Sequence, residues 1–75
     1  MSKSLVESVA QCVKRLRHEK GISQEDLADR ADLDRTYISG IERAVRNISL
    51  NSLSSIIHAL GLTTKEFLEE LYKDL

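Results

Sequence analysis

The sequence predicts an all-α fold in which residues 1–75 form one domain of five short helices. Apolar residues recur at intervals of three and four along five successive stretches, the pattern of helices that bury one face. Serine, threonine or aspartate precedes several of these stretches, where a side-chain oxygen can cap a helix. The chain also contains no proline. Together these features favour a small helical domain.

Size limits how such a domain can be stabilised. The core of a 75-residue chain is marginal by itself, so a metal, disulfides or a partner subunit usually contributes. The one cysteine, Cys12, cannot form an internal disulfide, and no Cys/His cluster has zinc spacing. We therefore expect no metal or other cofactor, and we expect oligomerisation to supply the additional stability.

Charge and hydropathy narrow the class of protein. No apolar run approaches a membrane span, and the start, MSKSLVESVA, lacks the apolar region of a signal peptide, so we expect a cytoplasmic protein. The net charge of −1 argues against a non-specific polycation, but the distribution of charge matters more than its sum. Residues 14–20 carry four Lys/Arg against one glutamate, and residues 35–46 carry three arginines against one glutamate. These basic stretches bracket the helix that is proposed below to read DNA.

The first predicted helix spans residues 5–19. Lys20 and Gly21 end it, a basic residue followed by the usual left-handed residue. Cys12 falls in the apolar stripe, where core packing is favoured over a nucleophilic role because no base stands near it in sequence. Lys14, Arg15 and Lys20 point outward, and both contact with phosphate and a solvated face remain open for them. The apolar stripe consists of Leu5, Val9, Cys12, Val13 and Leu16.

Two short helices, residues 24–31 and 35–43, are predicted next. Ser23 and Asp26 form a capping box at the start of the first, and Asp34 caps the second. Two helices at a steep angle across a short turn describe the helix-turn-helix of DNA-binding proteins.

The outward side of the second of these helices suits a DNA groove better than a core. Arg35 is the best candidate for reading a base, because its guanidinium can bond both acceptors of a guanine. Thr36 offers a hydroxyl or a methyl group, while Ser39 and Gly40 let the backbone approach closely. Tyr37 has two interpretations, contact with DNA or partial packing into the domain. We favour DNA contact because Ile38 and Ile41 already supply the buried stripe.

Further polar residues are candidates for contacts with the DNA backbone. Gln24 stands at a helix N-terminus, where its amide and the backbone N–H groups can hold a phosphate. The loop after the reading helix brings Arg43, Arg46 and Asn47 near the groove, with Arg46 also a candidate for the minor groove. A solvated loop is the alternative for these three. Ser52, near the start of the fourth helix, is a weaker candidate.

The last two predicted helices are strongly apolar. The fourth follows Ser49 and runs through Leu60, and the fifth, residues 64–75, begins with a capping box of Thr63 and Glu66. So small a core cannot cover all of their apolar surface, so we expect part of it to face a second copy of the chain. The stripe of the fourth helix is Leu50, Leu53, Ile56, Ile57 and Leu60. The candidates for a homodimer interface are Phe67, Leu68, Leu71 and Tyr72.

The helix-turn-helix stretch resembles the phage-repressor-like family. In that family's pattern a glutamine opens the first helix, an alanine follows four residues later, and an isoleucine and a glutamate lie in the second helix. The corresponding residues here are Gln24, Ala28, Ile38 and Glu42. The family usually has glycine in the turn, where this chain has Asp32, a residue that tolerates positive φ better than most. The resemblance implies a five-helix, repressor-like helix-turn-helix DNA-binding domain with a structural ion pair between Arg17 and Glu42.

Within that family, the string DRTYISGIER and the residues after it look most like the controller proteins of restriction-modification systems. Those are small helical homodimers that bind paired, palindromic operator half-sites in double-stranded DNA, first activating and then repressing. The resemblance implies that Arg35, Thr36 and Tyr37 read the sequence. It further implies that Arg46, Asn47 and Ser52 make supporting contacts.

An activator must also contact RNA polymerase, and the sigma subunit is the expected partner. The acids Glu25 and Asp26 are candidates for that contact, with solubility and a favourable interaction with the helix dipole as the alternative. A phage-type repressor, or an antitoxin-like module that neutralises an enzyme with its fifth helix, are the competing functions. An enzyme is disfavoured, because the sequence has no Ser/His/Asp, Cys/His, metal-ligand or phosphate-loop constellation.

Overall fold

The computed structural model describes residues 3–75 and confirms the all-α prediction, since every regular element in that range is a helix. The first two residues of the MSKSLVESVA stretch, in which we expected no leader, lie outside the described part. The five helices are α1 Leu5–Glu19, α2 Gln24–Ala31, α3 Arg35–Glu42, α4 Leu50–Ala59 and α5 Thr64–Tyr72.

Each helix begins at a residue whose side chain accepts a hydrogen bond from a backbone N–H of the first turn. The capping boxes predicted at Ser23–Asp26 and Thr63–Glu66 are both present. A third box, which the sequence analysis did not identify, joins Ser4 to Glu7 at the start of α1. These local bonds satisfy donors that would otherwise have no partner, and they set where each helix starts. The capping residues are Ser4, Ser23, Asp34, Ser49 and Thr63.

Within residues 3–75, four helix ends carry a residue with positive φ. Gly21 follows α1 and Gly61 follows α4, as the sequence indicates. Asp32 follows α2 with φ 56°, which confirms that aspartate takes the place of glycine in the turn. Ala44 follows α3 with φ 59°, and nothing in its sequence context predicted this. The two helices of the helix-turn-helix thus end at non-glycine residues in a conformation that is unfavourable for residues with a Cβ.

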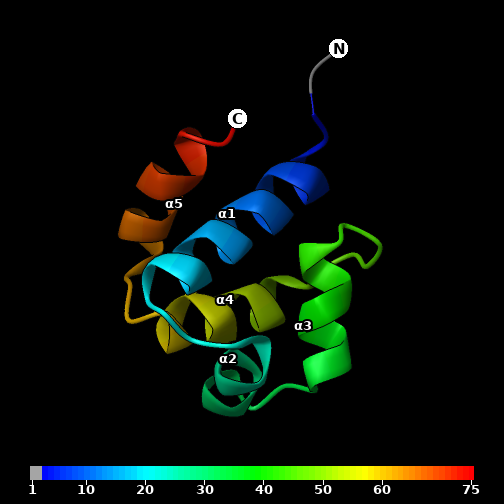
Figure 1. The fold of residues 1–75 in the computed structure, drawn as a ribbon. Coiled ribbons are helices and arrows are strands. Elements are labelled where there is room, and N and C mark those ends of the chain that lie inside the picture. The colour runs from blue at the N-terminus through cyan, green and yellow to red at the C-terminus, as the bar shows by residue number, and fades with distance from the viewer. Residues whose placement is uncertain (1–2) are drawn as a thin grey trace.

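The helices pack around one core, with α1 and α4 at the centre of Figure 1, α5 on the left, α3 on the right and α2 below. α2 packs against α3 and α4, and α1 packs against α3 and α5. The reading helix and α5 therefore lie on different sides of the molecule (Figure 1). The buried core residues include Val9, Cys12, Val13, Leu16, Leu27, Ile38, Ile41, Ile56, Ile57, Leu60, Phe67 and Leu71.

Two residues of the predicted apolar stripes are not in the core. Leu5 is 65% exposed and Leu50 is 84% exposed, so placing them in the buried faces of α1 and α4 was wrong. Each stands in the first turn of its helix, at the edge of a shallow hollow that Val9 and Leu53 also line. Helical spacing gives the correct face, but it does not say how far along the helix the neighbouring elements reach.

Two of the four residues predicted for the dimer interface belong instead to the core of the monomer. The side chains of Phe67 and Leu71 are buried, at 0% and 8% exposure, because α1 and α4 pack against this face of α5. Leu68 and Tyr72, on the other side of α5, are 54% and 78% exposed and stay candidates for an interface.

No helix within residues 3–75 is long and apolar enough to cross a membrane. In the same part of the chain no group of three or more potential metal ligands comes together.

Candidate nucleic-acid interface

α3 presents its N-terminal turn to solvent while its other face is fixed in the core. Arg35 and Thr36 are exposed, whereas Ile38 and Ile41 are buried. Asp34 accepts a hydrogen bond from the N–H of Thr36 at 3.1 Å, and that bond is the main reason why the pKa of its carboxyl is lowered. The cap at its start and the buried face along its length therefore fix the exposed end of α3. An element that reads DNA needs such a rigid support.

Of the two interpretations that the sequence left open for Tyr37, the structure confirms partial packing into the domain, and contact with DNA stays a prediction. Its side chain is half-buried and packs against the core, and Arg46 of the loop after α3 lies over the ring. The Arg46 guanidinium carbon lies 5.5 Å from the centre of the ring, within the range of a cation–π contact. Ser39 is also half-buried.

Gly40 is placed differently from what the sequence analysis expected. We predicted an outward position where the backbone approaches DNA, but Gly40 is buried, and the aliphatic part of Arg46 covers it. The sequence did contain a signal, because glycine in the interior of a helix is unfavourable and usually has a packing or functional reason.

A buried polar network joins α1, α2 and α3, and it fixes the orientation of α3, the proposed reading helix. Arg17 of α1 donates to Glu42 of α3 through Nε at 2.7 Å and through Nη2 at 3.0 Å. The same guanidinium donates through Nη1 to the carbonyl of Ile22 at 2.8 Å. The ion pair that the resemblance implied is thus present, with Arg17 and Glu42 only 8% and 9% exposed.

Gln24 belongs to this network. Its Nε2 donates to Oε1 of Glu42 at 3.1 Å, so the side-chain amide is directed into the protein and does not extend toward solvent to hold a phosphate. The prediction of a side-chain phosphate contact is not supported by this geometry. The backbone N–H groups at the start of α2 remain available for that role.

The loop after α3 carries exposed polar residues beside the reading helix. Arg43, Arg46 and Asn47 are all exposed. Because Glu42 is buried against Arg17, the exposed charges of residues 35–47 are the three arginines, and this segment is more basic than its sequence suggests. Ser52 is half-buried and its hydroxyl is 3.0 Å from that of Ser49.

Arg15 does not face the proposed DNA surface. It donates to the Glu70 carboxylate at 3.0 Å, the Glu70 carbonyl at 3.1 Å and the Asp74 carboxylate at 3.0 Å, and it also pairs with Glu19. A phosphate contact by Arg15 is therefore contradicted, because its guanidinium holds the C-terminal end of α5 against α1. Lys14 and Lys20 are exposed.

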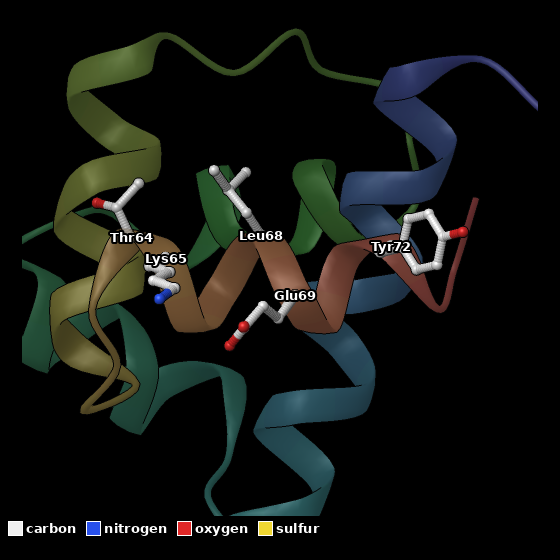
Figure 2. A pocket seen from close by; sticks show the side chains of 5 residues that line it. All are labelled: Thr64, Lys65, Leu68, Glu69 and Tyr72. Carbon is white, nitrogen blue, oxygen red and sulfur yellow. The ribbon is translucent and has the colours of Figure 1, made fainter.

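The solvent side of α5 forms an apolar surface of its own. Figure 2 shows Leu68 projecting from the middle of the helix and Tyr72 from its far end, and these two line a shallow pocket together with Thr64, Lys65 and Glu69. Leu75, just beyond the helix, is 68% exposed. The helix that carries this surface lies on a different side of the fold from α3 (Figure 1).

The acids of α2 and the single cysteine have the exposure that the sequence predicts. Glu25 and Asp26 are exposed, and the Asp26 carboxylate also accepts the N–H of Ser23, which lowers the pKa of that carboxyl. Cys12 is fully buried, and burial, together with the nearby Asp74, raises the pKa of its thiol to about 12. A thiol that stays protonated in a core is not a nucleophile.

A short helix with an exposed arginine in its first turn, fixed across a tight turn on a second helix, defines a helix-turn-helix protein. The family model described as helix-turn-helix matches residues 13–67, so the chain belongs to that family.

The relatives define a narrower group. The chain is 46% identical over 63 residues to the control protein C.MunI of a Mycoplasma species, which covers 83% of this chain and 85% of the relative. It is 48% identical over 60 residues to C.BamHI of Bacillus amyloliquefaciens, which covers 79% and 74%. The crystal structure of the wild-type restriction-modification controller protein C.Esp1396I matches with a TM-score of 0.92 and 45% identity, over 97% of this chain and 94% of that one.

C.Esp1396I has also been solved as a tetramer in complex with its natural 35 base-pair operator, again with a TM-score of 0.92 to this chain. Within the helix-turn-helix family, this chain therefore stands close to the controller proteins of restriction-modification systems.

Proposed function

We propose that this chain is a sequence-specific, DNA-binding transcriptional regulator that controls a restriction-modification operon, as activator and autorepressor. The observation that carries the proposal is the exposed N-terminal turn of α3, whose orientation the buried Arg17–Glu42 pair fixes. A rigid helix with an arginine at its first position is suited to the major groove.

Base reading falls to the exposed side of α3. Arg35 is free to bond both acceptors of a guanine, a pairing that contributes about 1–3 kcal/mol of discrimination. Thr36 stands next to it with a hydroxyl and a methyl group, and Ser39 lies one turn further along the same side of α3. Tyr37 is half-buried on a neighbouring face of the helix, and we assign the accessible part of its ring to DNA as well. The folded core behind them contributes orientation and no sequence information.

Contacts to the DNA backbone come from the loop and the adjacent helix. Arg43, Arg46 and Asn47 are exposed beside α3, and Ser52 lies in the first turn of α4. Arginines that neutralise phosphates release counterions, so affinity for DNA falls steeply as salt rises.

A homodimer places two such readers on one face of DNA. The solvent side of α5 supplies the apolar surface, through Leu68, Tyr72 and Leu75. A two-fold axis relating two reading helices about 34 Å apart, one turn of DNA, requires a near-palindromic operator. The tetramer of the similar C.Esp1396I on its operator supports assembly on DNA.

Regulation in both directions requires a second partner besides DNA. The exposed carboxylates of Glu25 and Asp26 on α2 are the surface we assign to RNA polymerase, through its sigma subunit. We further propose that the chain acts in the cytoplasm and catalyses no reaction itself.

The proposal is tested by footprinting the purified protein on DNA upstream of its own gene at two salt concentrations. We expect protection of inverted repeats that weakens at the higher salt. Arg35→Ala should lose the protection, while Arg30→Ala, which replaces an exposed arginine of α2, should keep it. If the parent chain protects no DNA at either salt, the regulator assignment fails, and the antitoxin-like interaction module becomes the leading function.

A further inference from the structure

The strongest unexplained feature of the reading helix is Gly40 in the interior of α3. Glycine destabilises a helix interior relative to alanine, so a packing or functional reason is expected. The backbone does not require it, because positive φ among the glycines occurs only at Gly21 and Gly61 within the described chain. The reason must lie in what a side chain at this position would displace.

A Cβ atom at position 40 would lie 2.7 Å from Cγ of Arg46, 3.5 Å from its Cβ and 3.8 Å from its Cδ. These are atoms near the base of the Arg46 side chain, so rotating only its tip cannot relieve the overlap. An alanine at position 40 therefore displaces the whole Arg46 side chain or the loop that carries it.

The loop returns to the same point of α3. The N–H of Val45 donates to the carbonyl of Gly40 at 3.0 Å, and the N–H of Ala44 donates to that of Ile41 at 2.9 Å. These two bonds bring the chain back over the end of α3, with Ala44 in the left-handed conformation. The stem of Arg46 then fills the space that a Gly40 side chain would occupy.

The position of the Arg46 side chain over Gly40, which we call its seat, determines where the charge of Arg46 lies. From it, the guanidinium reaches the ring of Tyr37, 5.5 Å from its centre. Tyr37 and Gly40 are three residues apart on α3 and so share one face of the helix. The Arg46 side chain thus runs along that face, from the gap at Gly40 to the tyrosine ring.

We propose that Gly40 is a positioning residue for DNA reading, because its missing side chain seats Arg46 against Tyr37 and makes the two a single recognition unit. This inference rests on the proposed function for its DNA arm. The seating itself does not depend on DNA, so it can be tested with the protein alone.

The first test is the Gly40→Ala variant in solution without DNA. Its melting temperature should change little, because the helix preference of alanine offsets the cost of displacing Arg46. The δ protons of Arg46 should show an upfield ring-current shift in the parent that is lost in Gly40→Ala and in Tyr37→Leu. Ser54→Ala, at an exposed position of α4, is the matched control for helix propensity and should keep the shift.

The second test is a double-mutant cycle on the protected upstream DNA. Gly40→Ala should weaken binding roughly two- to fivefold, the equivalent of about 0.5–1 kcal/mol for an exposed cation–π contact. In an Arg46→Ala background the same change should have no further effect, because there is no side chain left to displace.

Two results would overturn the inference. One is an unchanged ring-current shift in Gly40→Ala, which would show that Arg46 does not use the seat. The other is an equal loss of binding in both backgrounds, which would show that Gly40 acts on DNA without Arg46. If the parent protects no DNA, the proposed function fails separately, and the ring-current shift alone decides whether Gly40 seats Arg46.

Discussion

Arg15 and Arg17 stand two residues apart on α1 and hold opposite sides of the molecule. Two residues correspond to about 200° around a helix, so the side chains leave in different directions. Arg17 enters the interior and pairs with Glu42 of the reading helix, whereas Arg15 is half-buried and pairs with Glu70 and Asp74 near the C-terminus. One helix thus fixes both the DNA-reading element and the helix proposed for dimerisation.

The two ion-pair sites differ in how far they are exposed to water. The Arg17–Glu42 pair is removed from water, so the loss of one partner leaves a buried charge without compensation. The Arg15 cluster keeps partial contact with solvent, which can replace a lost partner in part. Similar ion pairs on one helix can thus contribute very differently to stability, and burial decides which contribution is larger.

The largest expected effect is at the buried pair. Glu42→Ala should lower the free energy of unfolding by about 3–5 kcal/mol, because it strands the Arg17 charge. Urea denaturation followed by circular dichroism measures this, with Glu25→Ala as an exposed control expected to change stability by less than about 0.5 kcal/mol.

The paired replacement Arg17→Met with Glu42→Leu should recover most of the stability that Glu42→Ala loses, because neither charge is then buried alone. A loss below about 1 kcal/mol for Glu42→Ala would mean that solvent reaches the pair, and the contrast with Arg15 would disappear.

The next effect separates the two faces of α5, the helix that Arg15 holds. Leu71→Ala should cost about 2–5 kcal/mol as a buried large-to-small change. Leu68→Ala removes an exposed side chain, and it should leave the monomer's stability nearly unchanged while weakening self-association. Analytical ultracentrifugation together with denaturation distinguishes them, and a Leu68→Asp variant that stays dimeric would move the interface away from this face.

A smaller effect is expected at the half-buried cluster. Arg15→Gln should lower the free energy of unfolding by about 1–2 kcal/mol, between the values for exposed ion pairs and for hydrogen bonds to charged groups. Lys14→Gln is the matched control, since Lys14 is its exposed neighbour on the same helix. A loss as large as that of Glu42→Ala would show that burial does not rank the two sites.

The smallest effect is a change in pH dependence. The pKa of Glu70 is lowered from 4.5, first by its hydrogen bond from Arg15 and then by that from Lys73. A carboxyl with a depressed pKa contributes stability that is present above 4.5 and is lost as pH falls through its folded value. Arg15→Gln should therefore show a shallower loss of stability below pH 4.5 than the parent in parallel acid titrations. Identical slopes would mean that Arg15 does not hold the Glu70 carboxylate.

Helix starts could be predicted well because their signals are local, whereas α5, predicted to run to residue 75, ends at Tyr72. Ser23 with Asp26, and Thr63 with Glu66, lie within one turn of each other and form their caps without help from the rest of the chain. Asp32 took the left-handed conformation that the turn requires. The family resemblance added the Arg17–Glu42 pair, which joins residues 25 positions apart and has no local signal.

The sequence reasoning failed where a side chain's partner comes from a distant element. Phe67 was expected at a dimer interface and is core, because α1 and α4 cover that side of α5. The side-chain amide of Gln24, predicted to hold a phosphate, donates to Glu42, a geometry that does not support the predicted contact. Both cases concern which neighbour a face of a correctly predicted helix meets.

The sequence by itself therefore determined the five helices, most of their capping residues and the position of the helix-turn-helix, since these depend on interactions within a few residues. The tertiary structure decided which apolar side chains form the core, which arginine holds α5, and where Arg46 lies. Those outcomes depend on packing between elements far apart in the chain, because burial changes both the space open to a side chain and the strength of its charge interactions.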